Sequence, residues 1–332
     1  MGEFDLIARY FKHPARRAAL GVGDDCALLQ ARPGTQLAIS TDMLVQGRHF
    51  FADVDPASLG HKALAVNLSD LAACGAQPLA FTLALALPEA NEAWLAAFAQ
   101  GLLTLADAHD CELIGGDTTG GPLTICITVF GEVPVVAGRS QALLRSGAQP
   151  GDDLYVSGTL GDARLALDAL QGQLTLPADV LTAARARLER PTPRLALGLA
   201  LRGIASAAMD VSDGLLGDLG HILQASGVGA LVDVDIATTL IANNDYFIRA
   251  SGQFDAQWLQ TTRRTLVLSG GDDYELLFTA PAHLRDAVAA AGRLSQTPVT
   301  RIGQIQAQPG LRLVDGAGQA LPNHYASFDH FK

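Results

Sequence analysis

The sequence predicts a two-domain α/β (α+β) protein, and three observations lead to that class. Its 332 residues suit two domains of ordinary size, each with its own core. Short apolar runs of strand length alternate with longer segments of helical spacing. Carboxylates recur beside Gly, Ser or Thr where several of these runs end, and ligands gather at such strand ends in α/β proteins.

Composition and charge narrow the class of protein further. The chain is 49% hydrophobic and 17% charged, which is typical of a globular protein, and no apolar run reaches the ~18 residues of a membrane helix. A net charge of −11 disfavours a nucleic-acid partner. The acidic opening predicts no secretory signal. The four scattered cysteines (Cys26, Cys74, Cys111 and Cys126) predict reduced thiols in a cytoplasmic protein.

The first domain is expected to span residues 1–138. It should begin with an amphipathic helix over 4–11 and a glycine-rich turn at 21–25 that leads into a strand ending at Leu29. Such a turn is typical both of phosphate cradles and of ordinary tight turns. A strand over 37–42 follows, with its polar residues at the C-terminal end.

A long helix comes next, from Pro56 with Asp55 as N-cap to its end at Gly75. On this helix Asn67 and Asp70 share a face, which either meets solvent or belongs to a site. A strand over 79–87 and a helix over 91–111 complete this part.

The segment over 111–132 is predicted to be strand, Gly-Gly turn and strand, with Asp117 following the two glycines. Glycines let a backbone pass close to a ligand, and a carboxylate beside them could hold a metal ion on phosphate oxygens. Ordinary turn chemistry explains Gly-Gly-Asp as well, so the motif gains weight only from similar ones elsewhere.

The second domain is expected to span residues 150–332, after a linker with Pro134 and Gly138. Strands are predicted over 154–157, 207–210, 230–236 and 275–279, with helices from 162, from 191–193 and after 214, the last ending at Gly227, and with a final helix and two strands. Acidic turns lie at 210–214 and 270–273, and the region 238–264 is the least patterned. We interpret Asp152 as a turn cap, a reading that stays open for Asp25 and Asp273.

Clustered aspartates indicate magnesium chemistry on phosphates. Mg²⁺ is usually held by one or two carboxylates together with substrate phosphates. The chain has twenty arginines but only three lysines, and Mg²⁺ would supply positive charge that lysines often provide at phosphate sites. No EF-hand, zinc-ligand spacing, Walker loop, protein-kinase motif or G-x-S-x-G elbow occurs. What remains is ATP or another phosphate compound, bound by metal ions, glycine-rich backbone and arginine.

Eight motifs, in order along almost the whole chain, resemble those of the thiamine-monophosphate kinases. They are residues 21–29 (GVGDDCALL), 40–42 (STD), 49–50 (HF), 65–73 (AVNLSDLAA), 113–119 (LIGGDTT), 145–151 (RSGAQPG), 210–215 (DVSDGL) and 269–276 (SGGDDYEL). The resemblance implies the two-domain fold of the aminoimidazole-ribonucleotide-synthetase-like superfamily. Its N-terminal ATP- and Mg-binding domain has a mixed sheet that pairs across a homodimer, and its C-terminal α/β domain completes the active-site cleft.

The same resemblance implies direct transfer of the ATP γ-phosphoryl group to thiamine monophosphate, giving thiamine diphosphate and ADP, with several Mg²⁺ ions and no phosphoenzyme. Other readings are a different ATP-dependent synthetase of the superfamily or a non-catalytic nucleotide- or metal-binding regulator.

Residue roles carry over from the family by motif position. The expected metal ligands are Asp24, Ser40, Thr41, Asp42, Asp70, Asp117, Asp210 and Asp213. The expected ATP contacts are Gly116, Asp117, Arg145 and Ser212, and the expected thiamine-phosphate contacts are His49, Asp272 and Phe328, with Tyr325 as the alternative aromatic. Asp117, Asp210, Asp213 and Arg145 would carry the reaction. No general base is expected, because a phosphate acceptor is largely ionised at pH 7.

Overall fold

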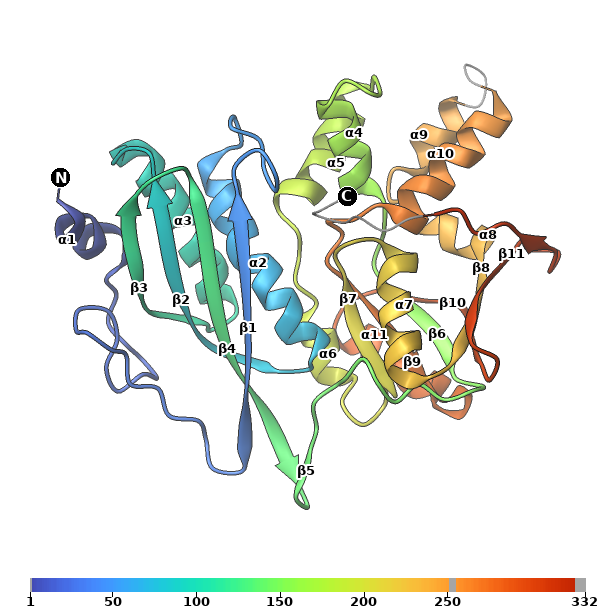
Figure 1. Cartoon of the computed structure of the whole chain (residues 1–332), viewed down its shortest axis with the longest axis horizontal. Helices are drawn as coiled ribbons and strands as arrows, with labels where there is room; N and C mark the ends of the chain where they lie inside the picture. The colour runs from blue at the N-terminus through green and yellow to red at the C-terminus, as the bar shows by residue number, and fades with distance from the viewer. Residues whose placement is uncertain (1, 251–254, 326–332) are drawn as a thin grey trace. The chain divides into compact units, whose positions relative to one another are not determined.

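The computed structural model describes residues 2–250 and 255–325, and the chain divides into two compact units (Figure 1). Unit 1 comprises Met1–Leu71 and Ala76–Ala142, and unit 2 comprises Ala72–Gly75 and Leu143–Lys332. Each unit contains its own mixed sheet with helices, which confirms the predicted α/β class. None of the described helices combines the length and the apolar character that a membrane crossing requires.

The sheet of unit 1 has the strand order β1-β4-β2-β3, with β5 also paired to β4. Its strands are β1 (Thr35–Val45), β2 (Gln77–Leu87), β3 (Glu112–Gly120), β4 (Thr124–Val136) and β5 (Arg139–Ser140). All pairs are antiparallel except β2 with β3, which are joined by a helical crossover, as parallel neighbours require.

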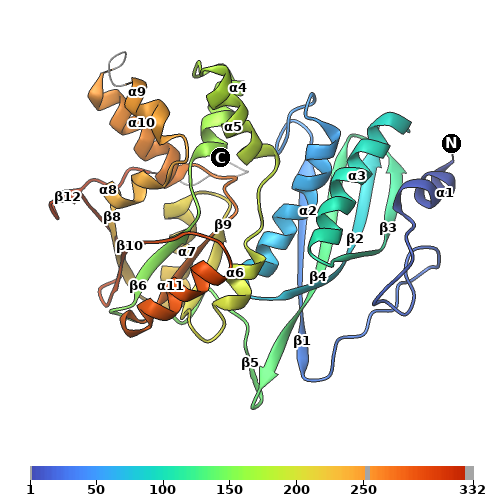
Figure 2. The ribbon, with the colours of Figure 1, turned by 180° about the vertical axis from the view of Figure 1, so that it is seen from behind.

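The helices α2 (Pro56–Ala73) and α3 (Glu92–Ala108) cover one face of this sheet; they lie behind it in Figure 1 and in front of it in Figure 2. The predicted cap at Asp55 is confirmed, because its side chain accepts from Ser58 N at 2.8 Å. Asn91 caps α3 in the same way and accepts from Trp94 N at 3.0 Å. The carboxylate of Asp55 and the amide of Asn91 each accept from an N–H group that has no partner within the first turn of its helix.

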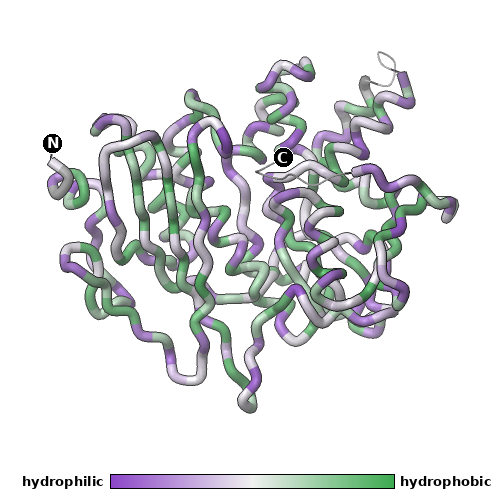
Figure 3. The backbone as a smooth tube through the Cα atoms, viewed as in Figure 1, coloured by the Kyte–Doolittle hydropathy of each residue, from purple (hydrophilic) through white to green (hydrophobic). Residues whose placement is uncertain are grey.

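The opposite face of the sheet is exposed along β1, whereas Ala80 of β2 is buried on that face beside Ala18 and Phe130. Side chains of β1 alternate, so that Leu37, Ile39, Thr41 and Met43 point away from α2, and we call these four residues the open face. Leu37, Ile39 and Met43 are 45%, 59% and 54% exposed. Elsewhere hydrophobic residues run through the strands of both units (Figure 3), and most of the large ones are buried.

Three predictions about unit 1 are wrong. β1 continues to Val45, because β4 pairs with it along its whole length, so residues 40–42 lie within the strand and not at its end. β3 runs through residues 115–117 without a turn, since its parallel ladder with β2 continues from Ala80 to Leu87 after a single irregularity. Residues 26–29 form no strand and make only an isolated bridge, Leu20 to Leu28.

The predicted N-terminal helix is present in two pieces. They are α1 (Glu3–Leu6) and a single π-helical stretch, η1 (Ile7–Phe11), in which Tyr10 and Phe11 are buried. The wider π turn places the two aromatic side chains against the rest of unit 1, where they contribute to its core.

Unit 2 is built on a seven-stranded sheet of order β12-β11-β8-β10-β6-β9-β7. Its strands are β6 (Asp153–Ser157), β7 (Ala207–Val211), β8 (Gly229–Asp233), β9 (Glu275–Ala280), β10 (Val299–Gln306), β11 (Gly310–Val314) and β12 (Ala320–Leu321). Its helices are α4 (Asp162–Leu170), α5 (Ala178–Glu189), α6 (Leu195–Ala200), α7 (Leu215–Ser226), α8 (Val234–Ala237), α9 (Asn244–Ala250), α10 (Ala256–Ser269) and α11 (Arg285–Leu294), with 3-10 turns η2 (Thr238–Leu240) and η3 (Ala282–Leu284).

Two features of unit 2 differ from the sequence-based expectation. The strand predicted over 230–236 ends at Asp233, whose side chain accepts from Ile236 N at 3.0 Å and caps α8. The weakly patterned region 238–264 contains α9 and most of α10. In α10 the residues buried are Leu259 and the run Leu266, Val267 and Leu268, so packing at its C-terminal end supports a helix with little amphipathic pattern.

Candidate functional site

In unit 1, β1 and α2 bring three residues of the predicted site, Ser40, Asp42 and Asp70, together with Asn67. The Ser40 hydroxyl donates to Asp70 Oδ2 at 2.5 Å, and Asp42 N donates to Asn67 Oδ1 at 3.1 Å. Ser40 and Asp42 lie on the β1 face that meets α2, and Asn67 is only 1% exposed. The shared face of Asn67 and Asp70 therefore meets β1 and not only solvent.

Thr41 lies on the other side of the same strand. Its hydroxyl is 2.8 Å from the hydroxyl of Thr128 on β4, and it belongs to the open face. Within one chain the Thr41 side chain is thus separated from Ser40 and Asp42 by the sheet itself, as the alternation of a strand requires.

Asp24 lies outside the regular elements, in the glycine-rich loop before β1. It is exposed, its Oδ1 accepts from Asp25 N at 2.9 Å, and an isolated bridge joins it to Val22. The carboxylate thus accepts a hydrogen bond from the backbone of its own loop.

Gly116 and Asp117 lie in the middle of β3. Gly116 has a φ of +147°, and a Cβ at this position would come within 1.8 Å of the Leu83 carbonyl oxygen, so only glycine fits. Asp117 is exposed and pairs with Ala84 of β2. A small cavity of about 40 Å³ adjoins it, lined by Ile7, Phe11, Val22, Leu83, Leu113, Gly115, Gly116, Asp117 and Thr118. The glycine that sequence reasoning assigned to a turn instead permits close strand packing beside an exposed carboxylate.

His49 lies just beyond β1, and its ring is anchored. Its Nδ1 accepts from Val45 N at 3.0 Å, which fixes the ring so that Nε2 points away from this bond. Its carbonyl accepts from Lys62 Nζ at 3.4 Å, and Lys62 is 3% exposed on α2. Sequence reasoning missed Lys62; the signal was one of only three lysines in the chain, next to a largely apolar stretch of α2.

In unit 2, residues 210–214 link the end of β7 to the start of α7, and we call them the 210–214 turn. One oxygen of Asp218, Oδ2, accepts from the backbone N–H groups of Ser212, Asp213 and Gly214 at 3.0, 3.1 and 3.2 Å. Burial, and then the negative charge of Asp213, raise the pKa of Asp218 to about 7, against the opposing effect of the three N–H groups. Sequence reasoning missed Asp218, although it follows the DVSDG motif on the same face of the helix start.

A second turn, residues 270–274, packs against the first. Asp272 N donates to Ser212 O at 2.8 Å, and Tyr274 N donates to Val211 O at 2.8 Å. Asp272 and Tyr274 both have positive φ angles, 65° and 51°, and the Tyr274 hydroxyl donates to Asp272 Oδ1 at 3.2 Å. The structure therefore brings two predicted ATP- or metal-binding residues, Ser212 and Asp213, beside the predicted substrate residue Asp272.

Two other aspartates of unit 2 serve the fold. Both carboxylate oxygens of Asp273 accept from Gly161 N, at 2.9 and 3.1 Å, and burial raises the pKa of this 2% exposed group well above its usual range. Asp152 accepts from Gln149 N at 2.9 Å and from the Ser206 hydroxyl at 2.6 Å. The interpretation of Asp152 as a cap is confirmed, and Asp273 is a cap as well.

Arg145 lies on an exposed segment held to the end of α7. The hydroxyl of Ser226 donates to the Arg145 carbonyl at 3.3 Å and accepts from Gly147 N and Ala148 N at 3.2 Å each. The segment is thus fixed by its backbone, while the Arg145 side chain is exposed.

The predicted aromatic contact, Phe328, lies outside the described residues. Its alternative, Tyr325, is half-buried against the core of unit 2, and its ring stacks on His324 with centroids 4.7 Å apart. Burial raises the pKa of the Tyr325 hydroxyl.

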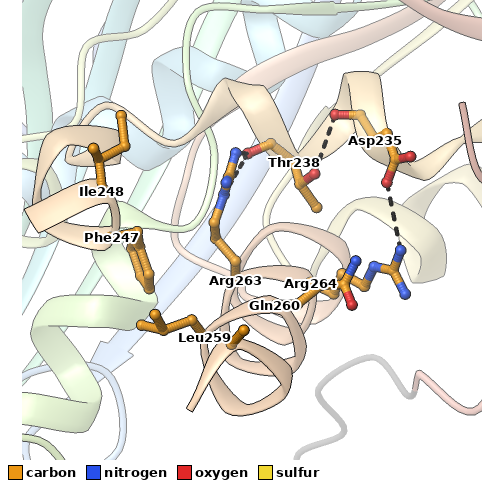
Figure 4. Close-up of a pocket in the computed structure, with 9 residues that line it drawn as sticks. Asp235, Thr238, Phe247, Ile248, Leu259, Gln260, Arg263 and Arg264 are labelled. Atoms are coloured by element: carbon orange, nitrogen blue, oxygen red, sulfur yellow. Dashed lines mark hydrogen bonds and ion pairs between the residues drawn. The ribbon is translucent and has the colours of Figure 1, made fainter. Parts of the chain in front are cut away.

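A cavity of about 530 Å³ lies in unit 2 between η2, α9 and α10 (Figure 4). It is lined by Asp235, Thr238, Phe247, Ile248, Ala256, Leu259, Gln260, Arg263 and Arg264, which include none of the predicted site residues. Both guanidinium groups are engaged, Arg263 with the Thr238 carbonyl at 2.9 Å and Arg264 with Asp235 at 3.4 Å. The cavity is therefore walled by arginines that already have partners.

The donor chemistry of the predicted site fits magnesium. All eight proposed ligands offer oxygen, the donor that Mg²⁺ prefers, and the pair Ser40–Asp70 and the turn with Asp213 each supply such oxygens within one unit. Among residues 2–250 and 255–325, no group of three or more His, Cys, Asp or Glu side chains forms a ready-made metal cage. The arrangement suits an ion that completes its coordination with phosphate and water.

Two family models match most of the chain. The model described as AIR synthase related protein, N-terminal domain, matches residues 23–133, and the one described as AIR synthase related protein, C-terminal domain, matches residues 149–316.

Several curated relatives and solved structures are similar to the chain over nearly its whole length. The thiamine-monophosphate kinase of Salmonella typhimurium (strain LT2) is 50% identical over 339 residues, covering 99% of this chain and 98% of that protein. The crystal structure of thiamine-monophosphate kinase from Stenotrophomonas maltophilia K279a has a TM-score of 0.80 at 47% identity and covers 96% of both chains. A third structure, AaThiL complexed with AMPPCP and TMP, has a TM-score of 0.75 at 29% identity and covers 91% of this chain and 89% of that one.

Proposed function

We propose that the chain transfers the γ-phosphoryl group of ATP to thiamine monophosphate. The basis is its family: the chain belongs to the AIR synthase related family and, within it, to the thiamine-monophosphate kinases. The observation that carries this function is 50% identity to one such kinase across 98% of that protein's length. The similarity extends over both units of the chain and over every domain of the relative.

ATP is the co-substrate, and thiamine diphosphate and ADP are the products. A related structure was solved with AMPPCP and TMP together, which supports a site that receives an ATP analogue and the phosphate acceptor at once. Both substrates carry negative charge, so the first requirement is to hold two phosphates that repel each other.

We propose that aspartates and hydroxyls in both units hold magnesium ions on these phosphates. The residues are Asp24, Ser40, Thr41, Asp42, Asp70 and Asp117 of unit 1 and Asp210 and Asp213 of unit 2. Bound there, Mg²⁺ would neutralise charge on the phosphate oxygens. The oxygen-only donor set, and the hydrogen bonds that fix Ser40 and the 210–214 turn, support this assignment.

The chain's own groups do the remaining work by positioning. The Gly116 backbone, Arg145 and Ser212 orient ATP, while His49, Asp272 and an aromatic near the C-terminus orient thiamine monophosphate; Phe328 is the proposed aromatic. Tyr274 fixes the Asp272 carboxylate by a 3.2 Å hydrogen bond. No residue acts as an essential base, because the acceptor phosphate is already ionised at pH 7.

We also propose that the chain acts as a homodimer that pairs through the open face of unit 1. Three apolar side chains there, Leu37, Ile39 and Met43, are about half exposed, and contiguous exposed apolar surface typically marks an interaction site. Thr41 belongs to this face, so pairing would bring a second copy beside one proposed ligand. ATP as donor and cysteines that form no disulfide suit the cytoplasm, the location we propose.

One incubation tests the function. The chain is mixed with ATP, Mg²⁺ and thiamine monophosphate, and nucleotides and thiamine phosphates are separated by chromatography. We expect equal amounts of thiamine diphosphate and ADP, and neither after EDTA. ADP without thiamine diphosphate would point to another acceptor and thus to another synthetase of the superfamily. Bound nucleotide with neither product would leave a non-catalytic binder.

A further inference from the structure

We propose that Asp218 is a positioning residue that sets the conformation of the 210–214 turn and thereby aims Ser212 and Asp213 at the ATP phosphates. This inference rests on the proposed function, since it gives that turn its task. Asp218 itself is 1% exposed and lies on α7, one turn beyond the residues it orders.

The geometry of three hydrogen bonds carries the inference. A single oxygen, Asp218 Oδ2, accepts from three successive N–H groups at 3.0–3.2 Å. Three consecutive N–H groups can converge on one point only when the backbone curls around it. Gly214 makes the curl possible with a φ of +116°, where a Cβ would also lie within 2.9 Å of Ser269 backbone atoms.

Because the N–H groups face Asp218, the side chains and carbonyls of the turn are directed elsewhere. The carbonyl of Ser212 accepts from Asp272 N at 2.8 Å, and that of Val211 accepts from Tyr274 N at 2.8 Å. A Cβ at Gly271 would lie 2.4 Å from the Ser212 oxygen, so the two turns are in close contact. The 210–214 turn is thus held on its N–H side by Asp218 and on its carbonyl side by residues 270–274.

A plain helix cap is the competing explanation, and the two differ in what a substitution changes. A cap contributes to stability alone, typically about 1 kcal/mol. A positioning residue also changes how the active groups meet ATP, and a displacement of roughly 1 Å can cost about 100-fold in rate.

The test compares Asp218→Leu, which keeps the shape and removes the acceptor, with Asp218→Asn, which keeps an acceptor oxygen and removes the charge. In the metal-free protein, amide hydrogen exchange at residues 212–214 should accelerate about 10-fold or more in Asp218→Leu and less in Asp218→Asn. In kinase assays, Asp218→Leu should lower kcat/KM for Mg-ATP about 100-fold, with KM for thiamine monophosphate within about 3-fold, and Asp218→Asn should recover much of the loss.

Asp162 provides the matched control. It is fully buried in the first turn of α4 and accepts from Ala242 N at 2.8 Å and from Asn243 N at 3.1 Å, and none of these three residues is a proposed site residue. Asp162→Leu should lower stability like Asp218→Leu but leave the KM for Mg-ATP of the folded enzyme within about 3-fold.

The outcomes separate the inference from the function it rests on. If the unmodified chain makes no thiamine diphosphate, the proposed function fails and the task given to the turn fails with it. If the unmodified chain is active and Asp218→Leu retains its KM for Mg-ATP and its kcat, only the positioning role is overturned. Unchanged exchange at residues 212–214 in both Asp218 variants would overturn it as well, even where activity falls.

Discussion

At Asp152, Asp162, Asp218 and Asp273 the carboxylate is buried and accepts backbone N–H groups, whereas Asp24 and Asp117 are exposed. A buried carboxylate is tolerated because those hydrogen bonds replace its hydration, and removing the acceptor leaves donors that cost about 1–3 kcal/mol each. An exposed carboxylate keeps its hydration and does not depend on such hydrogen bonds. Burial together with accepted backbone N–H groups thus marks Asp152, Asp162, Asp218 and Asp273 as aspartates that build the fold.

The exposed Asp117 provides a direct test of the proposed metal ligands. Asp117→Asn should lower kcat/KM for thiamine-diphosphate formation by about 100- to 1,000-fold, since a charged ligand at the phosphates is lost, with an unchanged melting temperature. Asp107→Asn is the matched control, because Asp107 is exposed on α3 and pairs only at the surface with Arg16 at 3.4 Å. Near-normal turnover of Asp117→Asn in a coupled ADP assay would remove Asp117 from the site.

The cysteines should differ in reactivity. Cys111 is 1% exposed, and burial raises the pKa of its thiol to about 12, so its reactive thiolate is scarce at any ordinary pH. Cys26 is exposed. At pH 8 a disulfide reagent should modify Cys26 within minutes and Cys111 only after denaturation, as peptide mass spectrometry would reveal. Rapid labelling of Cys111 in the folded chain would contradict its placement.

The network around Asp153 predicts an acid-dependent part of the stability. A hydrogen bond from Arg285 at 2.5 Å, and then a contact with Arg301 at 3.1 Å, lower the pKa of the fully buried Asp153 carboxyl in spite of its burial. A lowered folded-state pKa gives stability above the unfolded value, about 3.9, that is lost as the pH falls through the folded value.

Asp153→Asn should therefore be less stable than the parent chain at pH 7, by roughly 1–3 kcal/mol, and the gap should shrink below pH 4. Urea denaturation of the two chains at pH 7 and below pH 4 measures this difference in the free energy of unfolding. A gap that stays constant with pH would show that the ion pair is not its source.

At the scale of elements, β3 has a local structure that differs from the one its motif predicts. Gly-Gly-Asp is typical of a turn, yet here it continues a parallel strand, because Gly116 lies against the Leu83 carbonyl of β2 and no side chain could. The glycine serves close strand packing, so the exposed Asp117 follows from the register of the sheet and not from a loop.

Glycine substitutions on β3 test this account. Gly116→Ala should destabilise unit 1 by more than about 3 kcal/mol, since a Cβ would meet Leu83 O at 1.8 Å in a left-handed backbone. Gly120→Ala, on the same strand, should change the free energy of unfolding by less than about 0.5 kcal/mol, because nothing lies within 4 Å of its Cβ position. Equal effects in thermal denaturation would reject the packing argument.

At the scale of the whole molecule, the open face of unit 1 is the surface on which the proposed homodimer depends. Leu37, Ile39 and Met43 lie on one side of β1 with Thr41 among them, so the strand presents a largely apolar row on the side opposite α2. Burying such a row against another surface is favourable by about 25 cal/mol for each Å² of apolar area removed from water.

Ile39→Glu should convert the proposed homodimer into monomers, because pairing would bury a charge in an apolar contact. Leu294→Glu is the control, since Leu294 is 82% exposed on α11 of unit 2. Sedimentation velocity at several concentrations distinguishes the two variants. A parent chain that sediments as a monomer at micromolar concentration would reject the homodimer.

Local chemistry in the sequence was enough to predict the α/β class, the cap at Asp55 and the end of α7 at Gly227. The order of the acidic motifs, through their family resemblance, also led to the kinase. These features depend on interactions between residues that are close together in the chain, so they can be predicted from the sequence alone.

Only the tertiary structure decided which contacts arise between residues distant in sequence. β4 determines how far β1 extends, Leu83 determines why Gly116 is a glycine, and the core of unit 2 turns the weakly patterned region 238–264 helical. Asp218 was missed for a related reason: spacing reveals which residues share a helix face, but not that three N–H groups converge on one buried oxygen. Such pairings depend on packing energy summed over the fold, which no local pattern records.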